Sequence, residues 1–91
     1  MNESPPLITI GITCFNAESS IRRAVESALA QSWAHKEIIV VDDCSTDSSL
    51  ETLKDLKGIK VIHHEQNIGP GGARQTLLNE AQGEFIDYAW A

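Results

Sequence analysis

A continuous apolar run that stops at two adjacent aspartates limits most strongly what this chain can fold into. The run is Glu37–Val41, and it ends at Asp42 and Asp43. A strand that is apolar at successive positions is buried on both faces, and such strands occur in parallel sheets covered by helices on each side. The run therefore predicts an inner strand of a parallel α/β sheet with two carboxylates at its carboxyl end.

Strand and helix patterns alternate along the whole chain. The expected strands are 7–13, 37–41, 59–62 and 84–91; the expected helices are 18–32, one that follows a capping box at 48–51 and ends at 58, and one that follows the glycines of 69–72 and ends before 83. We expect Trp33 to close the first helix onto the core. The order β-α-β-α-β-α-β predicts right-handed crossovers and a doubly wound, mostly parallel sheet.

Length and charge narrow the function. The 91 residues fit a single small domain, 1–91, with a disordered lead at 1–6. A net charge of −6 argues against a nucleic-acid partner. We find no signal peptide and no apolar run long enough to cross a bilayer, which predicts a soluble cytoplasmic domain. Cys14 and Cys44 have neither disulfide-scaffold nor zinc spacing, so we expect two reduced thiols.

The residues that could carry chemistry follow the expected strands. Ligands of open α/β sheets bind outside the carboxyl ends of the strands. The candidates at that edge are Thr13, Phe15, Asn16, Asp42, Asp43 and Arg74. Adjacent carboxylates repel each other unless donors or cations compensate, and a carboxylate here could accept the N–H of a uracil or the hydroxyls of a ribose. A solvated acidic loop is the alternative.

The other candidates have structural explanations of equal or greater weight. Gly71 and Gly72 belong to a glycine-rich helix start that could cradle an anion, with Arg74 as a positive fork, but a tight turn explains the glycines as well. Arg74 could instead pair with Asp42 or Asp43. Taken alone, Phe15 would more often be a packing residue and Asp47 a turn residue. The two histidines at 63–64 lack metal spacing, so we expect them to be solvated.

Together, these segments resemble the N-terminal part of the family 2 glycosyltransferases, the inverting group with the GT-A fold. The matching segments are Ile8-Thr-Ile-Gly-Ile-Thr-Cys-Phe-Asn16, 24–31, Glu37-Ile-Ile-Val-Val-Asp-Asp-Cys-Ser-Thr-Asp47, Asn67-Ile-Gly-Pro-Gly-Gly-Ala-Arg74 and 81–86. The Val-Asp-Asp-Cys-Ser-Thr-Asp run is the most specific of them. The resemblance implies a Rossmann-like half of a GT-A fold, with strand order 3-2-1-4, and a nucleotide-sugar donor site.

The resemblance also implies roles for the candidates. Thr13 and Phe15 would line the base pocket, and Asp43 would accept the N–H of a uracil. Asp42 would support the ribose or the loop.

The remaining candidates would lie around the rest of the nucleotide. Asn16 would belong to the nucleotide site, and Arg74 would hold the base or the diphosphate side. Gly71 and Gly72 would form a phosphate-side loop.

The end of the sequence departs from the family pattern. Family members continue from 81–86 into an acidic motif that binds a divalent metal, Mg or Mn, and carry the catalytic base and the acceptor-binding half further on. Here Asp87 falls too early for that motif. We therefore expect a donor-binding portion that is truncated before the metal motif, holds no catalytic residue or metal, and is inactive alone. The full-length enzyme could be membrane-associated and would transfer a sugar to a saccharide, lipid or protein acceptor with inversion.

Three other functions are alternatives to a glycosyltransferase. The acidic pair superficially resembles that of a response-regulator receiver, although in that fold the pair follows the first strand. A dinucleotide-binding oxidoreductase fails because its glycine fingerprint should follow the first strand, whereas the glycines here follow the third. A non-catalytic α/β interaction fragment stays open, and its fourth strand would be an exposed edge that favours self-association.

Overall fold

The computed structural model describes residues 6–33, 35–83 and 85–90, the last range by its backbone only. The expected disordered lead, apart from Pro6, lies outside the described residues. The elements along the chain are β1 (Ile8–Cys14), α1 (Ile21–Leu29), β2 (Lys36–Asp42), the 3-10 turn η1 (Glu51–Leu53), β3 (Ile59–His63), α2 (Gly69–Glu80) and β4 (Phe85–Trp90). Within the described residues, no helix is both long and apolar enough to cross a membrane.

The four strands form one sheet in the order β3-β2-β1-β4, the order expected from the family resemblance. Every neighbouring pair is parallel. The register sets Cys14 of β1 beside Asp42 of β2, and Asp42 beside His63 of β3. The carboxyl ends of three strands therefore meet at one edge of the sheet, where α/β proteins bind their ligands.

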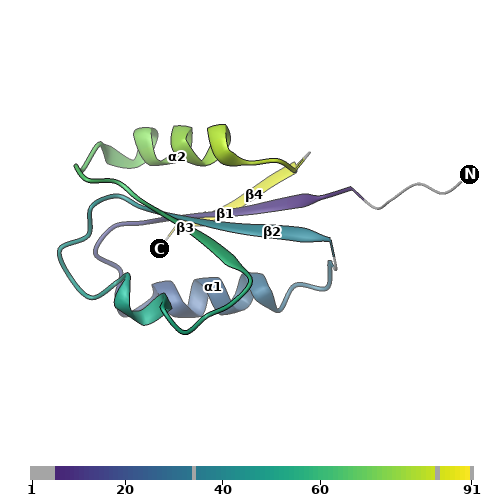
Figure 1. Ribbon diagram of the computed structural model, residues 1–91, viewed down its shortest axis with the longest axis horizontal. Helices are drawn as coiled ribbons and strands as arrows, with labels where there is room; N and C mark the ends of the chain where they lie inside the picture. Colours follow the sequence, from purple (N-terminus) through teal and green to yellow (C-terminus); the bar gives the residue numbers. More distant parts are fainter. Residues whose placement is uncertain (1–5, 34, 84, 91) are drawn as a thin grey trace, which may run out of the picture.

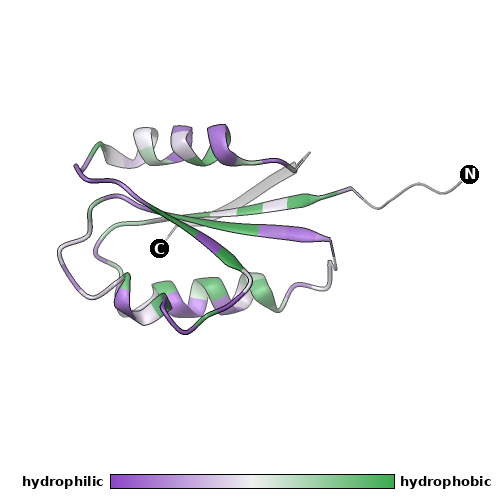
Figure 2. Ribbon diagram, viewed as in Figure 1, coloured by the Kyte–Doolittle hydropathy of each residue, from purple (hydrophilic) through white to green (hydrophobic). Residues whose placement is uncertain are grey.

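Helices cover both faces of this sheet, as the apolar run in β2 predicts (Figure 1). The α2 helix packs against β1 and β2 on one face, whereas α1 packs against the same strands and η1 on the other. Figure 2 shows that the apolar residues concentrate in the strands and along parts of the helices. Successive side chains of β2 belong to two hydrophobic cores, one on each face of the sheet. Ile38 and Val40 pack on the α1 side. Ile39 and Val41 pack on the α2 side.

A glycine lets α2 approach the sheet closely. A Cβ atom placed on Gly11 would lie 2.1 Å from Cδ1 of Leu77. The Leu77 side chain is 1% exposed and fills the space above β1 that any larger residue would need. Gly11 thereby sets the distance between α2 and the strand whose end carries Thr13 and Phe15.

The amino end of the sheet is held together by the carboxylate of Glu37. It accepts hydrogen bonds from the hydroxyl of Thr9 at 2.6 Å and from the backbone N–H groups of Gln82 and Gly83 at 2.6 and 3.0 Å. Burial raises the pKa of Glu37, but these bonds and the charge of Lys60 together lower it below its usual range. One side chain therefore joins β1, β2 and the segment that enters β4.

The first helix is shorter than predicted, with α1 at 21–29 in place of 18–32. Its first residue, Ile21, donates its N–H to the carbonyl of Ala17 at 2.8 Å, which closes a turn before the helix begins. The buried side of α1 is formed by Ile21, Val25 and Ala28, whereas Ser32, at the end of the expected range, lies beyond the helix and is exposed. The prediction for Trp33 is wrong, because its side chain is 44% exposed and does not close the helix onto the core.

The second expected helix is only the single turn η1, and the capping box before it does not form. Residues 45–49 are instead held by bonds to the loop after β1: the N–H of Ala17 donates to the hydroxyl of Ser49 at 2.9 Å. The chain must then turn at Gly58, whose φ of +84° ends the segment as predicted. Too few residues remain between these two points for a longer helix, and of the leucines at 50, 53 and 56 only Leu53 is fully buried.

Candidate functional site

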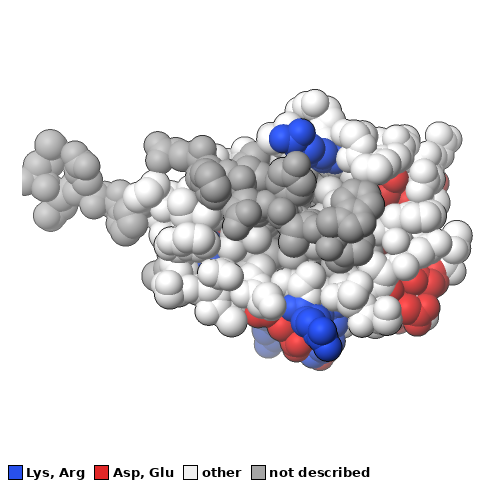
Figure 3. Space-filling view, turned by 180° about the vertical axis from the view of Figure 1, so that it is seen from behind, with Lys and Arg blue, Asp and Glu red and all other residues white. Residues whose placement is uncertain are grey.

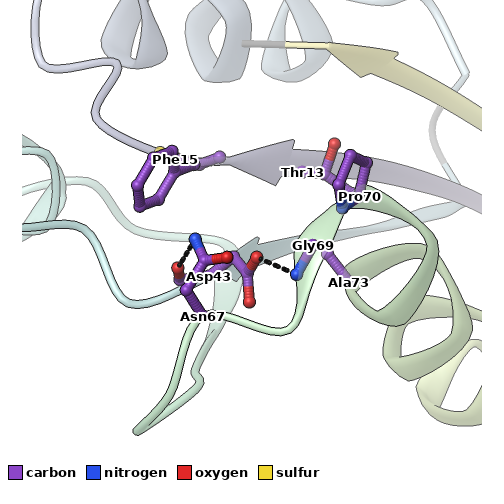
Figure 4. Close-up of a pocket in the computed structure, with 8 residues that line it drawn as sticks. Thr13, Phe15, Asp43, Asn67, Gly69, Pro70 and Ala73 are labelled. Carbon is purple, nitrogen blue, oxygen red and sulfur yellow. Dashed lines mark hydrogen bonds between the residues drawn. The ribbon is translucent and has the colours of Figure 1, made fainter.

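A cavity of about 260 Å³ opens at the carboxyl edge of the sheet, between the ends of β1 and β2 and the start of α2 (Figure 4). Its walls are mostly apolar. The lining residues are Thr13, Cys14, Phe15, Asp43, Asn67, Gly69, Pro70 and Ala73. The cavity thus collects three of the predicted nucleotide-binding residues, Thr13, Phe15 and Asp43.

Asp43 is the charged residue of this cavity, and its carboxylate caps α2. Oδ1 accepts the N–H of Ile68 at 3.0 Å and pairs with Nδ1 of His64 at 2.9 Å, while Oδ2 accepts the N–H of Gly69 at 2.8 Å. Burial raises the pKa of Asp43, but these hydrogen bonds lower it below its usual range. The carboxylate is therefore ionised near neutral pH, with the helix N-terminus as its partner.

The bonds to Asp43 leave one acceptor position open. A carboxylate has about four lone-pair sites, of which Oδ1 uses two and Oδ2 uses one for the partners above. Asp43 also lines the cavity. The carboxylate therefore has one acceptor position that the described residues do not use.

Thr13 offers a second polar group. Its residue is 4% exposed, and Oγ1 is buried with no hydrogen-bond partner among the described residues. Buried hydroxyls are nearly always satisfied, so an orphaned one in a cavity wall suggests a ligand partner. Phe15 stands at the opposite end of the cavity from Pro70 in Figure 4 and is 45% exposed, so its ring is available to a ligand.

Asp42 lies beneath the site rather than in it. It is 0% exposed, is absent from the cavity wall, and accepts the N–H of Ser45 at 3.0 Å. Its Oδ2 also pairs with Nδ1 of His63 at 3.2 Å. The two aspartates follow each other at the end of β2 and so point in opposite directions, which keeps their charges apart. Asp42 holds the loop that follows β2.

Asn16 is also a loop-holding residue. Its φ is 49°, a left-handed conformation that asparagine tolerates better than most residues. Its N–H donates to the hydroxyl of Ser45 at 2.9 Å, and its Oδ1 accepts the N–H of Thr46 at 2.7 Å. These bonds tie the loop that carries Phe15 to the loop after β2. Asn16 is not among the residues that line the cavity.

The glycines lie inside the first turn of α2 rather than in a loop before it, so that part of the prediction is wrong. The helix begins early because the Asp43 carboxylate takes two of the first N–H groups, and Pro70 has no N–H that needs a partner. The expected anion cradle is therefore filled by the protein's own carboxylate. Gly71, Gly72 and Arg74 stand outside the cavity wall, and Arg74 is exposed in the next turn.

The prediction of solvated histidines is wrong for His64, whereas His63 is exposed. His64 is 13% exposed in its side chain, and its Nε2 lies 2.8 Å from Oγ1 of Thr76 while Nδ1 faces Asp43. His63 is the last residue of β3 and is 45% exposed in its side chain. Sequence spacing could not indicate these contacts, because they depend on the pairing of β3 beside β2.

Both cysteines are free, as expected. Cys14 lines the cavity, and burial raises the pKa of its thiol to about 11, which keeps it protonated and unreactive. Asn67 also lines the cavity, although no sequence pattern indicated a role for it beyond its place in a family-like segment. Its side-chain amide donates to the carbonyl of Asp43 at 3.2 Å (Figure 4).

The fold family implies a divalent metal, and the described residues do not fit one. Among them, no group of three or more His, Cys, Asp or Glu side chains could hold a metal ion. The two carboxylates at this edge, Asp42 and Asp43, are already bonded to backbone N–H groups. We therefore assign no metal-dependent step to this part of the chain, and metal use stays a prediction for the complete enzyme.

The sequence profile of the family described as Glycosyl transferase family 2 matches residues 9–88. The chain belongs to glycosyl transferase family 2. This family 2 chain is 36% identical over 84 residues to the Escherichia coli protein named UDP-Glc:alpha-D-GlcNAc-diphosphoundecaprenol beta-1,3-glucosyltransferase WfaP, a match that covers 90% of this chain and 34% of that protein. The first curated relatives are covered over 24% to 36% of their length. The chain thus spans about a third of their length or less.

Solved structures show the same relation. The chain is similar to S. aureus TarS in complex with UDP-GlcNAc, with a TM-score of 0.80 and 32% identity over 91% of this chain and 26% of that one. It is also similar to the mannosyltransferase PcManGT from Pyrobaculum calidifontis in complex with GDP-Man and Mn2+, with a TM-score of 0.76 and 25% identity over the same shares. The α/β fold of the GT-A type is therefore confirmed, and family membership removes the receiver-like alternative.

Proposed function

We propose that this family 2 chain is the donor-binding unit of an inverting glycosyltransferase, and that its cavity takes the base of a uridine diphosphate sugar. The observation that carries the proposal is the Asp43 carboxylate in the wall of an apolar cavity, with one acceptor position that the protein does not use. A uracil ring carries one N–H donor between two carbonyl oxygens. Asp43 accepts that N–H, and the unpartnered hydroxyl of Thr13 donates to a carbonyl oxygen of the ring.

The aromatic wall supplies affinity without selecting the base. Stacking of a base on an aromatic ring is worth about 1–3 kcal/mol, and every base has a face that can stack. Phe15 is suited to this because it is half-exposed at the cavity. Selectivity then rests on Asp43: the unprotonated ring nitrogens of cytosine and adenine would turn a lone pair toward the carboxylate, and a buried polar mismatch of this kind is costly.

The names of similar proteins support a nucleotide-sugar donor. TarS was solved with UDP-GlcNAc and with UDP, and the E. coli relative is named for a UDP-Glc donor. PcManGT was solved with GDP-Man, and guanine also carries a ring N–H. We infer a uridine nucleotide for this chain, with a guanine nucleotide as the competitor to be tested against it.

The remaining predicted residues would act around the base. We propose that Asp42 and Asn16 hold the loops that shape the pocket, through their bonds to Ser45. Arg74, which follows the glycines in the first turn of α2, would lie on the base or diphosphate side. We propose that residues 1–91 form one donor-binding domain.

The complete enzyme would supply the chemistry. On the face seen in Figure 3, acidic side chains lie at the end that carries the loops after β1 and β2, and further acidic side chains lie beside basic ones at the lower edge. Such a surface does not neutralise a diphosphate by itself. We propose that Mg or Mn, a catalytic base and the site for a saccharide, lipid or protein acceptor belong to residues outside the described part, in a cytoplasmic enzyme.

The test is a ¹H–¹⁵N NMR titration of the chain with UDP, GDP and CDP. We expect UDP to bind in the millimolar range or tighter and to shift the amide signals of Phe15 and Asp43. Asp43→Ala should remove binding, and Phe15→Ala should weaken it about tenfold, as the loss of one stacked base implies. Trp33→Ala is the matched control, because Trp33 is equally exposed, at 44%, but lies outside the cavity wall.

Two results would contradict the proposal. One is the absence of shifts around Phe15 and Asp43 at millimolar UDP. The other is a CDP affinity equal to that of UDP, because a carboxylate acceptor cannot favour both ring edges equally.

A further inference from the structure

We propose that His64 is a positioning residue for nucleotide binding, acting through Asp43. This inference rests on the proposed function, because Asp43 is the group that meets the base. The ring of His64 stands between Asp43 at the end of β2 and Thr76 in α2, the two elements that border the cavity. His64 itself is not among the residues that line the cavity.

The first contact fixes the protonation of one ring nitrogen. Nδ1 of His64 lies 2.9 Å from Oδ1 of Asp43, and an ionised carboxylate can only accept a hydrogen bond. Nδ1 must therefore carry a proton. Asp43 Oδ1 is then fully occupied, by His64 and by the N–H of Ile68. The open acceptor position falls on Oδ2.

The second contact fixes the ring itself. Nε2 lies 2.8 Å from Oγ1 of Thr76, which in turn lies 3.2 Å from the carbonyl of Gly72 in the first turn of α2. The ring is thus held at both nitrogens and is only 13% exposed. A side chain held in this way limits rotation of the carboxylate that it contacts, so Oδ2 keeps one direction toward the cavity.

His63 provides an internal comparison. It is the neighbouring residue and makes the same kind of contact, with Nδ1 3.2 Å from Oδ2 of Asp42. Asp42 is not in the cavity wall, and the His63 side chain is 45% exposed. Loss of the contact between His64 and Asp43 should therefore weaken ligand binding, whereas loss of the contact between His63 and Asp42 should not.

The experiment separates the two contacts of His64 with two isosteric variants. In His64→Asn the amide N–H stands about as far from the backbone as Nδ1, so the donor to Asp43 is kept. In His64→Gln the amide reaches the position of Nε2, so the contact with Thr76 is kept and the donor to Asp43 is lost. We expect UDP affinity to fall about tenfold in His64→Gln, the loss of one hydrogen bond to a charged group, and to stay within about threefold in His64→Asn. His63→Gln should leave the affinity unchanged within about twofold.

A spectroscopic measurement on the unmodified chain tests the same contact. Long-range ¹H–¹⁵N spectra should show a protonated Nδ1 in His64, and addition of UDP should shift that nitrogen but not those of His63. An unprotonated Nδ1 in His64, or equal losses of affinity in the Asn and Gln variants, would overturn the inference, because a merely structural ring would not distinguish them. Failure of the unmodified chain to bind UDP would refute the proposed function itself.

Discussion

Replacing Asp43 by asparagine tests how much the carboxylate contributes to the start of α2. An asparagine keeps the shape but puts an NH2 group where one carboxylate oxygen stands. If its oxygen faces Ile68 and His64, the NH2 meets the N–H of Gly69, which now donates to Oδ2 at 2.8 Å. A buried donor without an acceptor costs about 1–3 kcal/mol, and the lost charge at the helix N-terminus adds about 0.3–1 kcal/mol. The free energy of unfolding should therefore fall by about 1.3–4 kcal/mol.

The assay is urea unfolding at several pH values. A chain of this length should have an unfolding free energy of about 5–14 kcal/mol, so the variant still folds. Because the folded pKa of Asp43 lies below its ordinary value of 3.8, the carboxylate's contribution is fully present above that value. It is lost as the pH falls through the lower folded pKa. The difference between the wild type and Asp43→Asn should thus be constant near neutral pH and shrink in acid.

A matched control uses an aspartate on the surface. The Asp55 side chain is 70% exposed and pairs with Arg22 at 2.7 Å, so Asp55→Asn should change stability far less. The reasoning about Asp43 fails if Asp43→Asn unfolds at the same urea concentration as the wild type at pH 7. It fails equally if the difference persists undiminished near pH 3, because a protonated carboxyl should resemble the amide.

Two further predictions concern the frame around the site. Gly11→Ala should lower the free energy of unfolding by about 1–3 kcal/mol, because its Cβ would lie 2.1 Å from Leu77. Gly71→Ala should raise it by about 0.5–1 kcal/mol, because a Cβ there has nothing within 4 Å and alanine favours the helix. Equal effects of the two changes on thermal unfolding would contradict this packing. Glu37→Gln should destabilise the chain at neutral pH through its lost bonds to Thr9 and two backbone N–H groups. Because the folded pKa of Glu37 lies below 4.5, that deficit should fade as acid titration protonates the wild-type carboxyl, and a deficit independent of pH would be evidence against it.

Local patterns in the sequence determined the architecture. The apolar run of β2, the alternation of strand and helix, and the acidic pair at the strand end were enough to predict a parallel sheet with a site at its carboxyl edge. The third expected helix forms as α2, and its Ala73 and Leu77 are buried. These features could be predicted because each depends on neighbours a few residues away. The family resemblance rested on the same segments, and the profile match confirms it.

Contacts between distant residues decided what the site residues do. The sequence could not indicate that Asp43 caps a helix that starts 26 residues later, or that His64 joins the same carboxylate. Nor could it indicate that residues 45–49 form hydrogen bonds with the loop around Asn16. Because of these bonds, the predicted helix is only one turn long. The acidic pair alone predicted a ligand-binding edge. Only the packing of α2 against the end of β2 decided that the two carboxylates have different roles. The N-terminus of α2 is a strong partner for the charge of Asp43. The pleat of the strand turns Asp42 to the opposite side.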